Sequence, residues 1–192
     1  METLIHILGI SGSLRRYSTN TGLLYAAQEL AAPHIQLEIF NLAPIPLYNA
    51  DVQALGDPRP VALLKERVAE ADALLIATPE YNYSISGVLK NAIDWVSRPP
   101  AESPLRDKPL AIIGAGGMFG TLRAQNHLRD IAVGLNMHPL NHPQLMVQRA
   151  WEKFDKQGNL QDEETRQRLA QVLEALEAWT LRLREREFVP SF

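Results

Sequence analysis

Short apolar runs alternate along the chain with segments in which apolar residues recur at helical spacing. The run 73–77 is apolar throughout, as in a parallel strand buried on both faces, whereas 36–40 alternates polar and apolar residues like a strand nearer a sheet edge. Three further runs show similar patterns. The sequence therefore predicts five strands, at 4–10, 36–40, 73–77, 109–114 and 137–140.

The remaining segments place apolar residues three and four positions apart, which is the spacing of an amphipathic helix. They predict helices at 19–32, 58–71, 86–96, 122–133 and 162–187. The stretch 41–56, interrupted by Pro44 and Pro46, predicts a long loop. Strands that alternate with helices predict an α/β fold, in which a doubly wound, five-stranded parallel sheet carries helices on both faces.

The composition narrows the class of protein. A chain of 192 residues, 46% of them apolar, has the size of one core, so we expect a single domain over 1–192. A formal net charge of −3 provides no positive excess to attract nucleic acid or an anionic membrane surface. Because cysteine is absent, disulfides and thiolate chemistry are excluded, and any redox chemistry must use a bound cofactor.

The hydropathy of the chain bears on its location. No apolar stretch reaches the roughly 20 residues that a membrane-spanning helix needs. The first residues lack the positive segment and the long apolar segment of a secretion signal. We therefore expect a cytoplasmic protein without a membrane span.

Three unusual loops follow the first, third and fourth predicted strands, at 11–20, 79–84 and 114–120. In an open parallel sheet, ligands bind beyond the carboxyl ends of the strands, where the strand order reverses. These loops are therefore the predicted ligand site.

The first loop is rich in hydroxyl groups and lacks both the dinucleotide fingerprint and the Walker spacing. With the free amides at the start of the next helix, its side chains predict a cradle for one phosphate group, such as that of FMN. The predicted cradle comprises Ser11, Ser13, Leu14, Arg15, Ser18, Thr19 and Asn20. In a purely structural alternative, Ser18 or Thr19 caps the helix and Ser11 begins a tight turn; capping and phosphate binding are compatible.

The second and third loops have the character of a site for a flat ring. Polar and aromatic residues follow the most apolar strand, and their backbone donors suit a heteroaromatic ring with amide edges. The glycine-rich third loop allows the backbone to approach a planar ligand closely. In the second loop, Pro79, Glu80, Tyr81 and Asn82 are placed to border such a ring, and Asn82 adds a side-chain amide. The alternative is that both loops are ordinary turns.

Two other kinds of site are disfavoured. His138 and His142 are four residues apart, but Pro139 and Pro143 prevent the helix that would align them, so we expect no metal site. The chain also lacks the Gly-x-Ser-x-Gly elbow of an α/β hydrolase.

The motifs Gly-Ser-Leu-Arg-Arg-Tyr-Ser-Thr-Asn at 12–20 and Pro-Glu-Tyr-Asn-Tyr-Ser-Ile-Ser-Gly-Val-Leu-Lys-Asn-Ala-Ile-Asp-Trp at 79–95 resemble those of the NADPH-dependent FMN reductase family. The resemblance extends through the glycine-rich turn to about residue 147. It implies a flavodoxin-like fold with the strand order 2-1-3-4-5. It also implies FMN as the cofactor, with the phosphate at Ser13, Arg15, Ser18 and Asn20 and the ring at 79–82, Ser84, Gly116 and Gly117.

The resemblance further implies an NAD(P)H:quinone reductase, in a family whose members also reduce chromate, azo dyes or free flavin. Relatives form dimers or tetramers, and the predicted helices 87–96 and 122–133 are our candidates for the interface. The donor, NADPH or NADH, and the physiological acceptor stay open. The flavin carries the chemistry, so we assign no catalytic side chain.

Two other functions remain as alternatives. One is a flavodoxin-like electron carrier that docks on protein partners, and the other is a flavin-binding or flavin-free regulatory module of the same fold. The net charge is only mildly negative and the three loops are not enriched in acidic residues, which favours the enzyme over the carrier.

Overall fold

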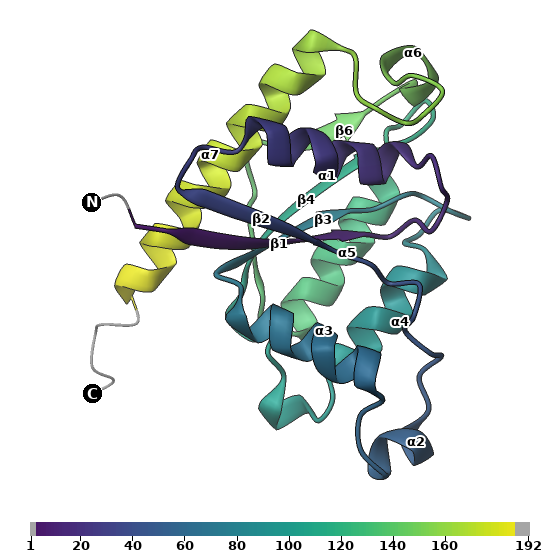
Figure 1. Ribbon diagram of the computed structural model, residues 1–192, viewed down its shortest axis with the longest axis vertical. Helices are drawn as coiled ribbons and strands as arrows, with labels where there is room; N and C mark the ends of the chain where they lie inside the picture. The colour runs from purple at the N-terminus through teal and green to yellow at the C-terminus, as the bar shows by residue number, and fades with distance from the viewer. Residues whose placement is uncertain (1–2, 187–192) are drawn as a thin grey trace.

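The computed structural model describes residues 3–186, in which six parallel strands form one sheet (Figure 1). The strands are β1 (Ile5–Ser11), β2 (Ile35–Phe40), β3 (Ala73–Ala77), β4 (Pro109–Ala115), β5 (His138–Pro139) and β6 (Leu145–Val147). Their order is β2-β1-β3-β4-β5, and β6 also pairs with β4. The predicted order 2-1-3-4-5 is confirmed.

The fifth position of the sheet differs from the prediction of one strand at 137–140. Pro109 pairs with His138 and Ile113 pairs with Leu145, so two short strands occupy this position one after the other. The strand β6 was not predicted, because a run of three residues that starts two positions after Pro143 is too short for its periodicity to be recognised.

Five helices of ten or more residues cover the sheet: α1 (Thr19–Leu30), α3 (Arg59–Glu70), α4 (Gly87–Val96), α5 (Leu122–Gly134) and α7 (Glu163–Arg186). Each was predicted to within a few residues; the predicted end of the last helix, Glu187, lies outside the described residues. Shorter helical segments are α2 (Ala50–Ala54), the 3-10 helix η1 (Pro100–Glu102) and α6 (Ala150–Lys153).

The prediction of a loop over the whole of 41–56 was wrong, because this segment contains α2. The side chain of Asn49 accepts a hydrogen bond of 2.8 Å from the amide of Asp51, which caps the first turn. A local cap thus starts a helix between the two prolines and Gly56 that the apolar pattern does not mark.

Alternate residues of the central strands face two different helix layers. Ile7, Leu75 and Ile113 pack under α1 and α7, whereas Leu8, Leu74 and Ile112 pack against the other layer, formed by α3, α4 and α5. Figure 1 shows α1 and α7 on one side of the sheet and α3, α4 and α5 on the other. Burial on both faces explains why β3 and β4 are apolar throughout.

The last helix covers the α1 face of the sheet through the predicted apolar stripe. Leu169, Val172, Leu173 and Leu176 are buried, and the indole nitrogen of Trp179 donates a 2.9 Å hydrogen bond to the carbonyl of His138 in β5. No helix in the described part of the chain is long and apolar enough to cross a membrane.

Candidate functional site

A cleft of about 660 Å³ opens at the carboxyl ends of β1, β3 and β4, where the three predicted loops meet. Its volume is within the ordinary range of small-molecule sites. The predicted residues that line it are Ser13, Arg15, Ser18, Thr19, Asn20, Pro79, Glu80, Tyr81 and Gly116. The first loop therefore contributes most of the predicted lining, and the other two loops contribute the rest.

Five predicted residues lie elsewhere. Ser11 and Leu14 line a neighbouring hollow of about 560 Å³, between the first loop and the end of β2, which Ser13 and Arg15 also line. Asn82, Ser84 and Gly117 line neither space. The first loop thus separates two hollows, and Arg15 borders both.

The serines of the first loop shape its backbone. Ser11 Oγ accepts a hydrogen bond of 3.2 Å from the amide of Ser13 and lies 2.9 Å from the hydroxyl of Thr21. Ser18 is the N-cap of α1, since its Oγ accepts from the amide of Thr21 at 3.3 Å. The capping interpretation is therefore confirmed for Ser18. The amides of Thr19 and Asn20, in the first turn, have no intrahelical acceptor and remain as donors for an anion.

Asn20 is a structural link as well as part of the cleft wall. Its Nδ2 donates to the carbonyl of Ala115, its Oδ1 accepts from the amide of Ala115, and both bonds are 3.0 Å long. The side chain is 4% exposed. It therefore fixes the start of α1 to the end of β4 and leaves one Nδ2 hydrogen for any other acceptor.

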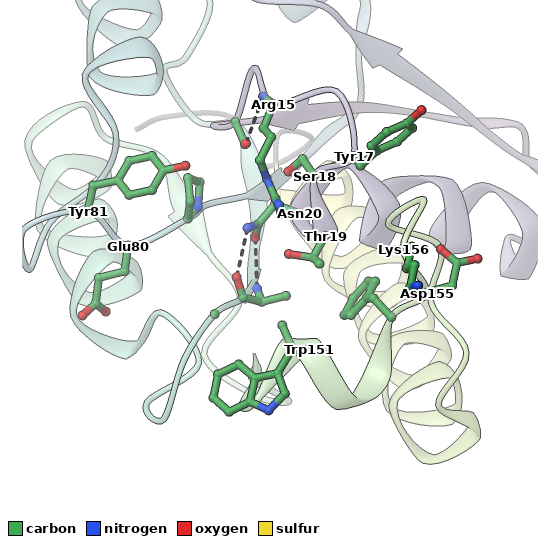
Figure 2. A pocket seen from close by; sticks show the side chains of 16 residues that line it. Arg15, Tyr17, Ser18, Thr19, Asn20, Glu80, Tyr81, Trp151, Asp155 and Lys156 are labelled. Atoms are coloured by element: carbon green, nitrogen blue, oxygen red, sulfur yellow. Dashed lines mark hydrogen bonds between the residues drawn. The ribbon is translucent and has the colours of Figure 1, made fainter.

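Glu80 turns its carboxylate away from the cleft and toward α5. It accepts hydrogen bonds from the amides of Arg123 at 2.9 Å and Ala124 at 3.4 Å, and it pairs with the Arg123 guanidinium at 3.0 Å. Thr121, the N-cap residue, makes no side-chain capping bond. Glu80 therefore caps α5 from a different loop, and Figure 2 shows its carboxylate directed away from Arg15.

A tight turn carries the end of the second loop out of the cleft. Tyr81 and Ser84 exchange two backbone hydrogen bonds of 3.0 Å, and Asn82 and Tyr83 between them have left-handed φ angles of 50° and 68°. Ser84 Oγ lies 3.0 Å from Nδ1 of His127 on α5. This turn explains why Asn82 and Ser84 do not line the cleft.

The third loop is fastened to the segment that follows β6. The amide of Gly116 donates to the carbonyl of Val147 at 3.0 Å, and the carbonyl of Gly116 accepts from the amide of Ala150 at 2.9 Å. At the first position of this loop, a Cβ atom on Gly114 would lie 2.0 Å from the hydroxyl of Thr121, so a side chain is excluded there. The third loop thus holds α6 beside the cleft.

Residues after β6 form a wall of the cleft that was not predicted from the sequence: Ala150, Trp151, Phe154, Asp155 and Lys156. Tyr17 and Ala115 complete the lining. Figure 2 shows Trp151 and the Asp155–Lys156 pair across from Arg15. The sequence from Asp155 to Asn159 has the composition of a turn, but no local signal indicates that it packs beside the first loop.

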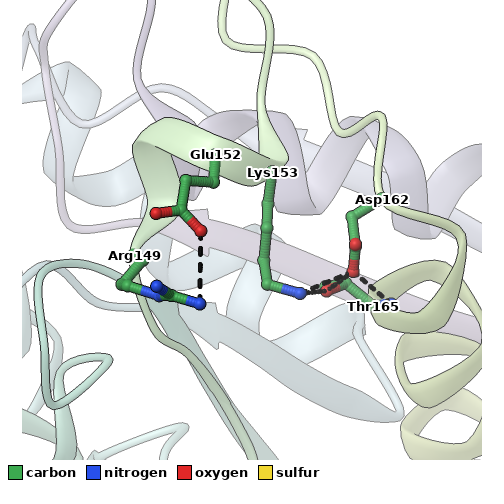
Figure 3. Close-up of polar contacts among 5 residues, drawn as sticks. All are labelled: Arg149, Glu152, Lys153, Asp162 and Thr165. Atoms are coloured by element: carbon green, nitrogen blue, oxygen red, sulfur yellow. Dashed lines mark hydrogen bonds and ion pairs between the residues drawn. The ribbon is translucent and has the colours of Figure 1, made fainter.

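An ion-pair network anchors this wall to the start of α7 (Figure 3). Lys153 Nζ lies 2.7 Å from Asp162 Oδ2, which also accepts from the amide of Thr165 at 2.9 Å and from its hydroxyl at 2.5 Å. Hydrogen bonds from Lys153 and then Thr165 are the main reasons that the pKa of Asp162 is lowered to about 2. A second pair, Arg149 with Glu152, lies 3.3 Å apart on the same segment.

The strand order and the cleft at the start of α1 define a protein with a flavodoxin-like fold and a candidate ligand-binding site at the expected edge of its sheet. Residues 5–152 match the family model described as NADPH-dependent FMN reductase. The chain belongs to this family.

Curated relatives match along nearly the whole chain. An NAD(P)H-dependent FMN reductase of Pseudomonas aeruginosa is 54% identical over 185 residues, which are 96% of this chain and 100% of that protein. An NADPH:quinone oxidoreductase of Arabidopsis thaliana is 47% identical over 189 residues, or 95% of each chain. Among solved structures, FerB, a flavoenzyme NAD(P)H:(acceptor) oxidoreductase of Paracoccus denitrificans, has a TM-score of 0.85 at 32% identity, covering 93% of this chain and 98% of FerB.

Proposed function

We propose that this protein is an FMN-dependent NAD(P)H oxidoreductase that reduces quinones by ping-pong transfer through the bound flavin. Chromate, azo compounds and free flavin are further candidate acceptors. The observation that carries the proposal is the cleft itself. In a member of the FMN reductase family, the start of α1, Arg15 and the loop 79–81 meet at the reversal of strand order.

The residues of the cleft fit FMN. The amides of Thr19 and Asn20, with Arg15 and Ser13, supply donors for a phosphate at the start of α1, where the helix dipole favours an anion. Pro79, Tyr81 and Gly116 also line the space, and an apolar ring, an aromatic ring and a residue without a side chain suit a flat ligand. Ser11 and Ser18 contribute by shaping the loop 11–20, and Leu14 remains a proposed cofactor contact. Asn82, Ser84 and Gly117 remain proposed ring contacts from outside the described lining of the cleft.

Bound FMN supplies the two-electron redox chemistry, and the protein supplies position and electrostatics. Asn20 holds α1 against β4, and Glu80 holds the second loop against α5. These links fix the proposed phosphate loop, 11–20, and the proposed ring-binding loop, 79–84, relative to each other. The flavin ring would then have one orientation when the nicotinamide donor binds and when the acceptor binds after it. No side chain needs to act as a general acid or base, and we propose none.

A flavin titration followed by reduction tests the proposal. We expect the purified protein to bind FMN in a one-to-one ratio and NADPH or NADH to bleach the flavin absorbance without oxygen. A quinone should then restore the absorbance. Absence of FMN binding would overturn the proposal. Flavin binding without bleaching by either nicotinamide would indicate the electron carrier instead, and steady-state rates with both nicotinamides establish the donor preference.

We further propose that the protein is a homodimer or homotetramer. An exposed apolar patch lies beside the cleft and comprises Tyr81, Tyr83, Met118 and Phe119, which are 53%, 67%, 64% and 56% exposed. The Arg123 guanidinium lies 4.1 Å from the ring centre of Tyr83 and 4.6 Å from that of Phe119, which orders the patch at the start of α5. Such a patch is typical of a contact surface, and it extends the candidate interface of α4 and α5.

The cytoplasm is the proposed location, because a reductase of this kind needs the reduced nicotinamide pool. The small-molecule donor and acceptor are its proposed partners besides its own copies. The mildly negative net charge supports a function without nucleic acid.

A further inference from the structure

The wall formed by residues 150–158 is held in one place against α1. A Cβ atom on Gly22 would lie 1.8 Å from the carbonyl oxygen of Gly158, and one on Gly158 would lie 3.0 Å from the backbone of Tyr17. Gly158 has a φ of +85°. Two glycines in contact therefore let the turn 155–159 pack directly on the first turns of α1, which brings Lys156 to the edge of the phosphate loop.

The acidic and the basic side chains that line the cleft differ in their contacts with the rest of the protein. Both of its carboxylates are engaged: Glu80 caps α5, and Asp155 accepts from the amides of Gln157 and Asn159 at 2.9 and 2.8 Å. The side-chain amide of Asn159, followed by these backbone bonds, lowers the pKa of Asp155. In contrast, the side chains of Arg15 and Lys156 make no hydrogen bond or ion pair with residues 3–185, the range whose side chains the structure describes.

These two cations flank the same helix terminus. Figure 2 shows Arg15 on one side of Ser18 and Thr19 and Lys156 on the other. A phosphate monoester carries a charge of roughly −1.5 to −2 near neutral pH, so one arginine leaves part of its charge unbalanced. A second cation at the same terminus would balance the remainder.

We propose that Lys156 is a second cationic ligand of the FMN phosphate, opposite Arg15 across the start of α1. This inference rests on the proposed function, because it requires FMN in the cleft. It assigns to the turn between α6 and α7 a direct part in holding the cofactor. The nearby carboxylate of Asp155 stays charged, but the amides of its own turn hold it, and Figure 2 shows it on the far side of Lys156 from Thr19.

Comparing FMN with riboflavin, which has the same ring but no phosphate, isolates the contribution of Lys156. Full-length protein freed of flavin is titrated with each ligand by flavin fluorescence. We expect Lys156→Gln to weaken FMN binding about ten-fold, because one charge-assisted hydrogen bond to the phosphate is lost. Riboflavin binding should stay unchanged, because riboflavin has no phosphate. Lys156→Arg, which keeps the charge, should retain most of the affinity. The matched control is Arg182→Gln, which removes one exposed charge from α7, away from the cleft.

A second readout does not depend on riboflavin. The ³¹P resonance of bound FMN should shift in Lys156→Gln and stay unchanged in Arg182→Gln. The dependence of FMN affinity on salt should also become shallower in Lys156→Gln, since one charge pair fewer is screened.

Four outcomes would overturn the inference. Equal weakening of both ligands would mean that Lys156 only shapes the wall, and unchanged FMN affinity with an unchanged ³¹P resonance would mean a solvated lysine. An effect on the KM for NADPH but not NADH, with FMN affinity intact, would place the side chain at the 2′-phosphate of the donor. If the wild-type protein binds neither flavin, the proposed function fails as well, whereas the other three outcomes reject the role of Lys156 alone.

Discussion

Glu80 shows how a single residue can connect a ligand loop to a helix. It lies in the cleft-lining loop after β3, yet its carboxylate replaces the missing side-chain cap at Thr121 and pairs with Arg123. Arg123 in turn stacks on Tyr83 and Phe119. The cleft and the exposed patch therefore share one electrostatic contact.

Removing this cap should destabilise the protein. We expect Glu80→Ala to lower the free energy of unfolding by about 1–2 kcal/mol, the usual cost of losing a helix cap with a charged partner. Glu80→Gln should cost less, because its amide oxygen still accepts from the helix amides. Urea denaturation followed by circular dichroism measures both. Glu174→Ala, at an exposed position of α7, is the control and should stay within about 0.5 kcal/mol of wild type. Equal stability of Glu80→Ala and wild type would refute the capping role.

At the residue scale, the sequence predicts which chemical groups the site contains better than it predicts which residues those groups contact. Hydroxyls, an arginine and a helix start predict an anion site from one short segment, because those donors are local. The partners of Asn20 and Glu80 lie 95 and 43 residues away. Such pairings depend on which strands become neighbours, so the residue pattern alone does not reveal that both side chains are engaged by backbone groups.

At the scale of elements, the long helices and the central strands follow from periodicity and stop signals. The elements that were missed, α2, η1, α6 and β6, have three to five residues each. Elements this short are stabilised by caps and by contacts with the rest of the chain rather than by their own pattern. This is why the wall of the cleft was absent from the predicted site.

The contact between α1 and the turn 155–159 gives a prediction about this wall. Gly22→Ala puts a methyl group 1.8 Å from the carbonyl oxygen of Gly158, so the turn has to move. We expect a loss of about 1–3 kcal/mol in the free energy of unfolding from overpacking, despite the higher helix propensity of alanine, and weaker FMN binding. The control is Gly134→Ala at the end of α5, where a Cβ atom meets nothing within 4 Å. Similar stability and FMN affinity in the two variants would contradict this packing.

The start of α7 should respond to pH through Asp162. Because its pKa is lowered from 3.8 to about 2, the folded state favours the carboxylate, and this stabilisation is complete above about pH 4 and is lost as the pH falls through about 2. At pH 7, Asp162→Ala should cost about 1 kcal/mol, as for an N-cap. The difference from wild type should shrink between about pH 4 and pH 2, measured by urea unfolding at each pH. Gln171→Ala, at an exposed position of α7 without an ionisable group, is the control and should show no such trend. A difference that does not change with pH would reject the role of ionisation.

At the scale of the whole molecule, the strand order places the cleft, and the apolar patch beside the cleft points to assembly. We expect the wild-type protein to sediment as a dimer or tetramer of its 21.5 kDa chain. Phe119→Glu should shift the protein toward monomers, since it puts a charge into the centre of the patch. Leu4→Glu, at the amino end of the sheet, is the control for an added surface charge and should leave the assembly unchanged. Wild-type protein that stays monomeric at high concentration would disprove the assembly.

The residues that line the cleft are far apart in the sequence, so they are synthesised at different times. Synthesis proceeds from the amino end, so Ser13, Pro79 and Gly116 leave the ribosome well before Trp151 and Lys156. A nascent chain that has emerged only as far as α5 carries the phosphate loop but lacks the opposite wall. The proposed function therefore makes flavin loading an event of the nearly finished chain, and truncation within the last quarter should remove cofactor retention before it removes the central strands of the sheet.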